Sequence, residues 1–136
     1  MINQLKNIPV KTIIWYIFFC IIGLFLYVNI ISYWRVYIHF VGLSGLPALF
    51  TIAISGNIFA ALILASTLAA VTKQRSFALG FSFGIIVIIQ AIVIAPLPTD
   101  SPLILWKLYI SEYLTFILSC GVITHYFGQV FHVKNT

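Results

Sequence analysis

Glu112 is the acidic residue that lies within a long apolar stretch, Leu103 to Phe127. An ionisable group inside a membrane helix costs about 2.5 to 3.5 kcal/mol on insertion scales, so it is a candidate functional or structural group. A protonated Glu112 that donates a hydrogen bond would act as a structural clamp. An accessible carboxylate would instead bind a proton or a ligand. Both interpretations require polar partners on neighbouring helices.

Two further polar residues, Gln90 and Asn57, are expected at a depth close to that of Glu112. Counted inward at 1.5 Å per residue, Glu112 lies about 13 Å, Gln90 about 10 Å and Asn57 about 16 Å deep. Thr115 shares a helical face with Glu112, because the two are three residues apart. The predicted polar site in the outer half of the bundle consists of Asn57, Gln90, Glu112 and Thr115. Alternatively, Lys107 draws Glu112 toward the membrane surface.

Other chemistry-bearing residues do not form a pattern typical of catalysis or of metal binding. His39, His125 and His132 are expected at different depths, which argues against a bis-histidine haem. Cys20 and Cys120 lack a C-x-x-C motif, and this favours small apolar packing residues over redox centres. Phosphate-binding, dinucleotide-binding and zinc-ligand spacings do not occur in the sequence. We therefore expect no catalytic residue, no metal and no cofactor.

The composition places these residues in a membrane protein. Of the 136 residues, 62% are apolar and 7% are charged, whereas roughly a quarter of the residues in a soluble domain are charged. The net charge of +5 is spread thinly and forms no basic stripe, so no nucleic-acid partner is expected. The lipid bilayer is the expected partner, together with other membrane subunits or further copies of the chain.

Apolar stretches long enough to cross a bilayer occur at 12–32, 46–71, 77–97 and 103–127. As helices they would be about 31, 39, 31 and 37 Å long, against a hydrocarbon core of about 30 Å. The expected fold is therefore an all-α integral membrane four-helix bundle formed by a single domain, 1–136. The aromatic and basic residues from Tyr33 to Phe40 predict a short helix on the membrane surface, with an irregular linker as the alternative.

Lys and Arg residues orient this bundle, because they favour the cytoplasmic side of short loops. The other side would carry Arg35 and Lys107. The side expected to be cytoplasmic carries Lys6, Lys11, Lys73, Arg75 and Lys134. Both termini are therefore predicted to be cytoplasmic, most simply at a bacterial inner membrane.

Small residues predict how the helices pack, since close approach in lipid depends on them. Gly56 and Ala60 lie on one stripe of the second stretch, and Gly80 and Gly84 lie on one stripe of the third. We expect these two helices to pack against each other. A small-residue face is equally suited to self-association, so the oligomeric state stays open.

Residues Pro47 to Gln90 contain GNIFAALIL at 56–64 and TKQRSFAL at 72–79. This region, roughly a third of the chain, resembles the middle of DoxX-like membrane proteins, which are small four-helix proteins with a short basic turn after the second helix. Many of those proteins carry an acidic residue where this chain has Asn57. The resemblance implies association with a respiratory or oxidoreductase complex, and it carries over no catalytic residue.

Two functions are therefore expected from the sequence. The first is an accessory or interaction subunit of a larger membrane assembly, because the chain shows no long extramembrane segment and no cofactor ligand set. An immunity protein against a pore-forming toxin belongs to the same class. The alternative is a small oligomeric transporter or channel with Glu112 as its coupling or selectivity group. A membrane enzyme linked to quinone or thiol chemistry ranks third.

Overall fold

The computed structural model describes residues 9–40, 42, 45–72, 77–96 and 98–134, and within them all regular structure is helical. The helices are α2 (Val10–Phe40), α3 (Gly45–Thr51), η1 (Ile52–Gly56), α4 (Asn57–Thr72), α5 (Phe77–Ile94) and α6 (Leu103–Lys134). Helical runs long and apolar enough to cross a membrane are Val10–Ile38, Leu49–Thr72, Phe77–Ile94 and Leu103–Gly128. The predicted all-α, four-span architecture is thereby confirmed, and the fold is that of a small multi-pass membrane protein.

An apolar composition of this kind favours helices, because the backbone N–H and C=O groups of a lipid-exposed segment must hydrogen-bond within that segment. Prolines mark two of the starts. The carbonyl of Pro9 accepts the backbone N–H of Thr12 at 2.9 Å, and that of Pro102 accepts the N–H of Leu105 at 3.0 Å. Between α2 and α3, Gly42 adopts a φ of 95°, a left-handed conformation that glycine reaches without strain.

The segment from Tyr33 to Phe40 continues α2 without a break, so both the separate surface helix and the irregular linker are wrong. Packing explains the continuation. The indole Nε1 of Trp34 donates to Ser55 Oγ at 2.9 Å, and the Trp34 ring stacks on Phe59 with centroids 4.9 Å apart. Contacts with the second span therefore hold the end of α2 as a helix.

The second span consists of α3, the π-helix η1 and α4 in direct succession. Its polar side chains bond to carbonyls one turn back, a habit of Ser, Thr and Asn that competes with the helical backbone bonds. Thr51 Oγ1 donates to the Pro47 carbonyl at 2.7 Å, and Asn57 Nδ2 donates to the Ala53 carbonyl at 2.6 Å. The first bond lies just before η1, and the second joins Asn57 to a residue within it. The π-helix itself was not predicted from the sequence.

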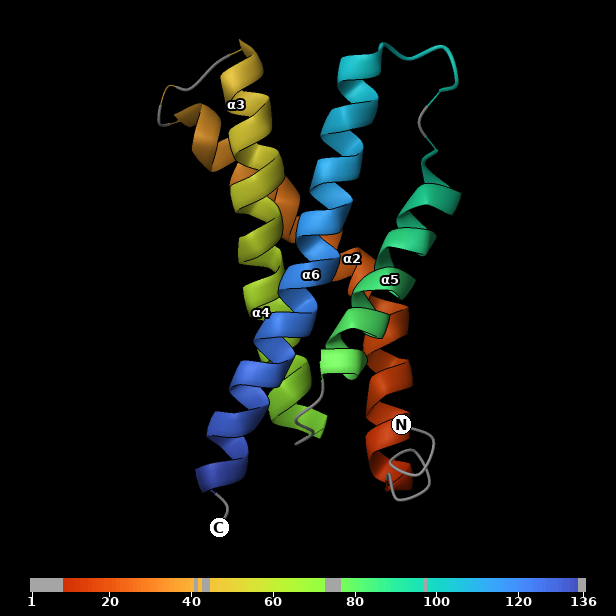
Figure 1. Cartoon of the computed structure of the whole chain (residues 1–136), viewed down its shortest axis with the longest axis vertical. Helices are drawn as coiled ribbons and strands as arrows, with labels where there is room; N and C mark the ends of the chain where they lie inside the picture. Colours follow the sequence, from red (N-terminus) through yellow and green to blue (C-terminus); the bar gives the residue numbers. More distant parts are fainter. Residues whose placement is uncertain (1–8, 41, 43–44, 73–76, 97, 135–136) are drawn as a thin grey trace.

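Helix α6 is the centre of the arrangement (Figure 1). It crosses the molecule diagonally and packs along both α4 and α5, whereas α4 and α5 barely touch. Helix α2 begins and α6 ends at the same end of the bundle, the lower end of Figure 1, which we call the terminal end. The opposite end is called the loop end. The basic turn at 73–75 and Lys6 lie outside the described residues.

The small residues do line helix contacts, but the expected pairing of the second and third spans is wrong. A Cβ added to Gly80 would lie 2.3 Å from the Cys120 carbonyl oxygen of α6, and one added to Gly84 would lie 3.0 Å from Ile117 Cα. Gly56 faces Trp34 of α2 instead. The fully buried Ala60 belongs to the core that α4 forms with α2, α5 and α6. The pairing fails because α6 lies between α4 and α5.

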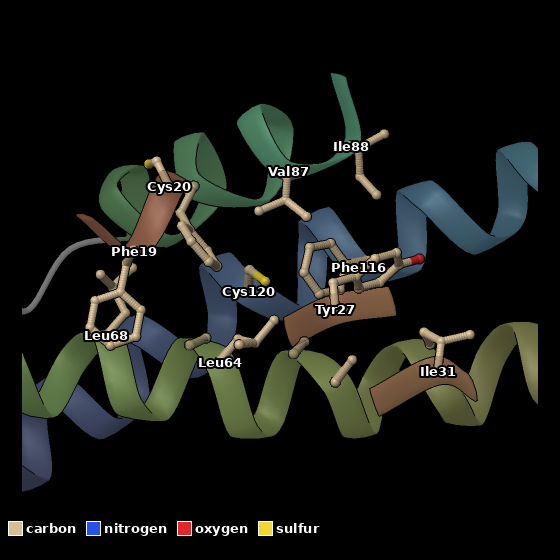
Figure 2. Packing of buried hydrophobic residues seen from close by; sticks show 14 residues of the cluster. Phe19, Cys20, Tyr27, Ile31, Leu64, Leu68, Val87, Ile88, Phe116 and Cys120 are labelled. Carbon is tan, nitrogen blue, oxygen red and sulfur yellow. The ribbon is translucent and has the colours of Figure 1, made fainter. Parts of the chain in front are cut away.

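The core lies where α2, α4, α5 and α6 meet (Figure 2). Its fully buried large side chains include Leu68, Phe83, Val87 and Phe116. Tyr27 of α2 packs its ring on Phe116 with centroids 4.6 Å apart, and this contact places the Tyr27 hydroxyl at the loop-end edge of the core. Large apolar side chains are also exposed on the outside of every span, as contact with lipid requires.

Candidate functional site

A cavity of about 320 Å³ opens between α2, α5 and α6 toward the loop end. This volume is at the lower end of the range of ligand pockets, roughly 300 to 1,000 Å³. Aliphatic side chains of α2 and α5 form much of its wall. The polar groups on the wall are Tyr27, Ser32, Arg35, Tyr109, Glu112 and Tyr113.

Helical spacing explains why these side chains share one space. Tyr27 and Arg35 of α2 are eight residues apart and therefore lie on one helical stripe. Tyr109, Glu112 and Tyr113 follow the three-and-four spacing that places residues on one face of α6. The wall also contains Ala91 of α5 and Ala95, the residue after this helix, whose short side chains leave the space open.

Glu112 is half-buried and lies next to the Asn57 side chain. Arg35 is the cationic group whose field acts on that carboxyl. In the described part of the chain, Arg35 and Glu112 form no direct ion pair, although both line the cavity. Lys107 is exposed and does not belong to the cavity wall, so the alternative in which it draws Glu112 to the surface finds no support.

Asn57 of α4 links α2 and η1 beside this site, outside the cavity wall. Its side chain is completely buried. The Tyr27 hydroxyl donates to Asn57 Oδ1 at 2.6 Å, and Asn57 Nδ2 donates to the Ala53 carbonyl at 2.6 Å. Because buried polar groups need partners, this network fixes the Asn57 amide beside Glu112.

The π-helix η1 immediately precedes Asn57 and contacts both α2 and α6. Single π-helical turns inside α-helices occur frequently at functional sites, because they re-aim the residues that follow. Here Trp34 holds the turn through Ser55, and Tyr27 holds Asn57. The turn therefore belongs to the support of the site.

The structure brings together two of the four residues proposed from the sequence. Asn57 and Glu112 are neighbours. Thr115 instead donates its hydroxyl to the Ser111 carbonyl at 2.6 Å, within its own helix. Gln90 is half-buried on α5 and is not part of the cavity wall; its Oε1 is buried without a hydrogen-bond partner among the described residues.

Sequence reasoning missed Arg35 and the tyrosines of the wall. The sequence placed Arg35 outside the membrane, on the side away from the cytoplasm. A signal was present in the spacing of Tyr109, Glu112 and Tyr113 on one face. That Tyr27 and Arg35 of α2 face the same space depends on the crossing of α2 and α6, which spacing does not encode.

The described residues contain no group of three or more His, Cys, Asp or Glu side chains placed to hold a metal ion. Cys20 and Cys120 are free thiols in the core. The cavity instead offers one carboxyl, one guanidinium and phenol groups. Such a set recognises charge and hydrogen-bonding groups of a ligand.

Comparison with family models, with curated proteins and with solved structures finds no match for this chain. The resemblance to DoxX-like proteins therefore stays a prediction from the residues.

Proposed function

We propose that this protein is a small membrane carrier that binds a charged solute at Glu112 within the loop-end cavity. The observation that carries the proposal is the position of Glu112 on the wall of a cavity of about 320 Å³, which a second charged group, Arg35, also lines. Ionisable groups within membrane spans mark solute, ion or proton pathways more often than they serve as inert packing. A purely structural clamp would be enclosed by protein and would not line an open space.

The direction of access follows from the distribution of charge. With both termini cytoplasmic, as the Lys and Arg residues predict, the cavity opens toward the side away from the cytoplasm. In a bacterial inner membrane this would expose Glu112 to solutes outside the cell. The carrier would work as an oligomer or as a single copy, and the cavity lies within one chain in either case.

An accessory subunit of a larger complex is the second candidate. Helix α2 favours it, since the helix exposes a long series of large apolar side chains, among them Phe18, Ile21, Phe25 and Val36. Contact with lipid alone would accommodate these apolar side chains equally well. The polar cavity is the more specific observation, so we rank the carrier first.

Counterflow in proteoliposomes distinguishes the two candidates. The probes are radiolabelled amino acids, simple alkylamines and simple carboxylates, each offered to liposomes preloaded with the same unlabelled compound. We expect wild-type protein to exchange at least one probe and Glu112→Gln to exchange it at least about tenfold more slowly, because removing a charged hydrogen bond costs about that factor. Lys107→Gln, which removes an exposed charge from the same helix, is the matched control and should exchange at the wild-type rate.

An absence of exchange with every probe would remove the carrier proposal. Co-purification of a defined membrane complex in mild detergent would then favour the accessory subunit.

A further inference from the structure

The cavity wall carries two opposite charges on two different helices. Arg35 comes from α2 and Glu112 comes from α6, and the two line one space without pairing directly in the described part of the chain. Their separation across an open space leaves each charge available to a ligand.

A ligand with a single charge would satisfy one of these groups and leave the other uncompensated. A simple amine or a simple carboxylate gains one charge-assisted contact and forgoes the other, so each should bind more weakly than a ligand that makes both contacts. A ligand that carries both charges pairs with both walls. The charge pattern of the cavity is therefore complementary to a zwitterion.

The aromatic groups indicate how such a ligand would lie. Tyr109 and Tyr113 line the wall on the same helical face as Glu112, with their rings edge to face at 5.7 Å. Aromatic faces attract ammonium groups, and the tyrosines therefore reinforce the preference of Glu112 for a cation. Arg35 then receives the anionic group, for which a guanidinium offers paired N–H donors.

On the basis of the proposed function, we propose that the solute is a small zwitterion, with its ammonium group at Glu112 and its carboxylate or phosphate at Arg35. Its apolar part would contact the aliphatic wall formed by Leu24, Val28 and Ile94. This chemistry has two sources: a free zwitterion such as an aliphatic amino acid, or the zwitterionic headgroup of a membrane lipid.

A matched set of three ligands tests the proposal. Leucine carries both charges, 3-methylbutan-1-amine lacks the carboxylate, and 4-methylpentanoate lacks the amine, while the aliphatic part stays the same. Binding is measured by calorimetry on the full chain in nanodiscs of phosphatidylglycerol. We expect leucine to bind at least about tenfold more tightly than either analogue, because each charged contact contributes about that factor.

Two variants assign the charges. In Arg35→Gln, leucine should bind no more tightly than the amine, and the affinity for the amine should not fall. In Glu112→Gln, leucine should bind no more tightly than the carboxylate. Lys107→Gln should leave all three affinities within about twofold of wild type, since Lys107 lies off the cavity wall.

The lipid source is tested with phosphoethanolamine as a free ligand and with nanodiscs that contain phosphatidylethanolamine. A headgroup site predicts that phosphoethanolamine binds more tightly than leucine. It also predicts that phosphatidylethanolamine in the nanodisc competes for the site and weakens the binding of free phosphoethanolamine by about tenfold or more. A site for free zwitterions predicts tight leucine binding that does not depend on the lipid.

The proposal is overturned if neither leucine nor phosphoethanolamine binds more tightly than the singly charged analogues, or if Arg35→Gln leaves their ranking unchanged. Binding or exchange of the amine alone would still support a carrier, so the failure of the zwitterion can be told apart from the failure of the proposed function.

Discussion

The contact between α5 and α6 differs at its two ends. Toward the terminal end, Gly80 and Gly84 bring the α5 backbone against Cys120 and Ile117 of α6. Toward the loop end the same two helices separate, as Figure 1 shows, and the cavity opens between them with Glu112 on its wall. One end is closed by backbone contact, and the other is left open for polar groups.

The difference teaches how a short membrane protein obtains both stability and a site. In lipid there is little hydrophobic drive between helices, so close packing at small residues must hold the bundle together. Gly80 and Gly84, toward the terminal end, allow that close packing. The open end then tolerates an ionisable residue, because its stability does not depend on filling the space. Three substitutions test this division, in order of the expected effect.

The largest effect is expected at the closed end, from Gly80→Ala. The new Cβ would lie 2.3 Å from the Cys120 carbonyl oxygen and from Thr124 Oγ1, so the helices must move apart. Overpacking of this kind costs about 1 to 3 kcal/mol. Thermal unfolding in detergent should show a lower Tm than wild type. Ala78→Val adds volume at an exposed position of α5 and should change stability by less than about 0.5 kcal/mol. Equal stability of Gly80→Ala and wild type would show that backbone contact does not hold this end.

A smaller effect is expected where the core meets the cavity, from Tyr27→Phe. The change removes the donor to Asn57 Oδ1 and leaves a buried acceptor unpaired. We expect a loss of about 0.5 to 1.5 kcal/mol, the range of hydrogen bonds between membrane helices. Tyr126→Phe, at an exposed position of α6, is the control. A double-mutant cycle with Asn57→Ala should give a coupling energy of similar size. Additive effects of the two substitutions would show that the Tyr27–Asn57 hydrogen bond does not contribute to stability.

The smallest effect on stability is expected at the open end, from Ala91→Leu. The larger side chain would enter the cavity without displacing backbone, so unfolding should shift by less than about 0.5 kcal/mol. Solute exchange, in contrast, should fall because the space for the ligand is reduced. A stability loss as large as that of Gly80→Ala would mean that the loop end is packed as tightly as the terminal end, and the comparison would fail.

Particular elements show which features sequence reasoning could reach. The four spans follow from apolar length, and Glu112 stands out because an acid in such a stretch is unusual. The continuation of α2 through Tyr33 to Phe40 was not predicted, because the aromatic and basic residues there also suit a membrane surface. Its helical form depends on the Trp34 contacts with Ser55 and Phe59.

The candidate site shows the same limit. Depth along a helix placed Asn57 and Glu112 in one proposed site, because depth is a one-dimensional property that spacing encodes, and the two side chains lie next to each other. Depth does not specify which face turns toward which helix. Asn57, Gln90 and Thr115 have suitable depth, but of the four predicted residues Glu112 alone is on the cavity wall. Arg35 was assigned to the surface; its side chain is exposed, and it also lines the cavity together with Glu112.

The amino-acid sequence by itself determined that the chain forms membrane-spanning helices, where they run and which ionisable residue they contain, since apolar length and backbone hydrogen bonding are local properties. Only the tertiary structure decided that α6 lies between α4 and α5, and that Arg35, Glu112 and the tyrosines line one open cavity. Small residues permit close approach to any helix with a matching face, so the choice of partner depends on how all four spans fit together.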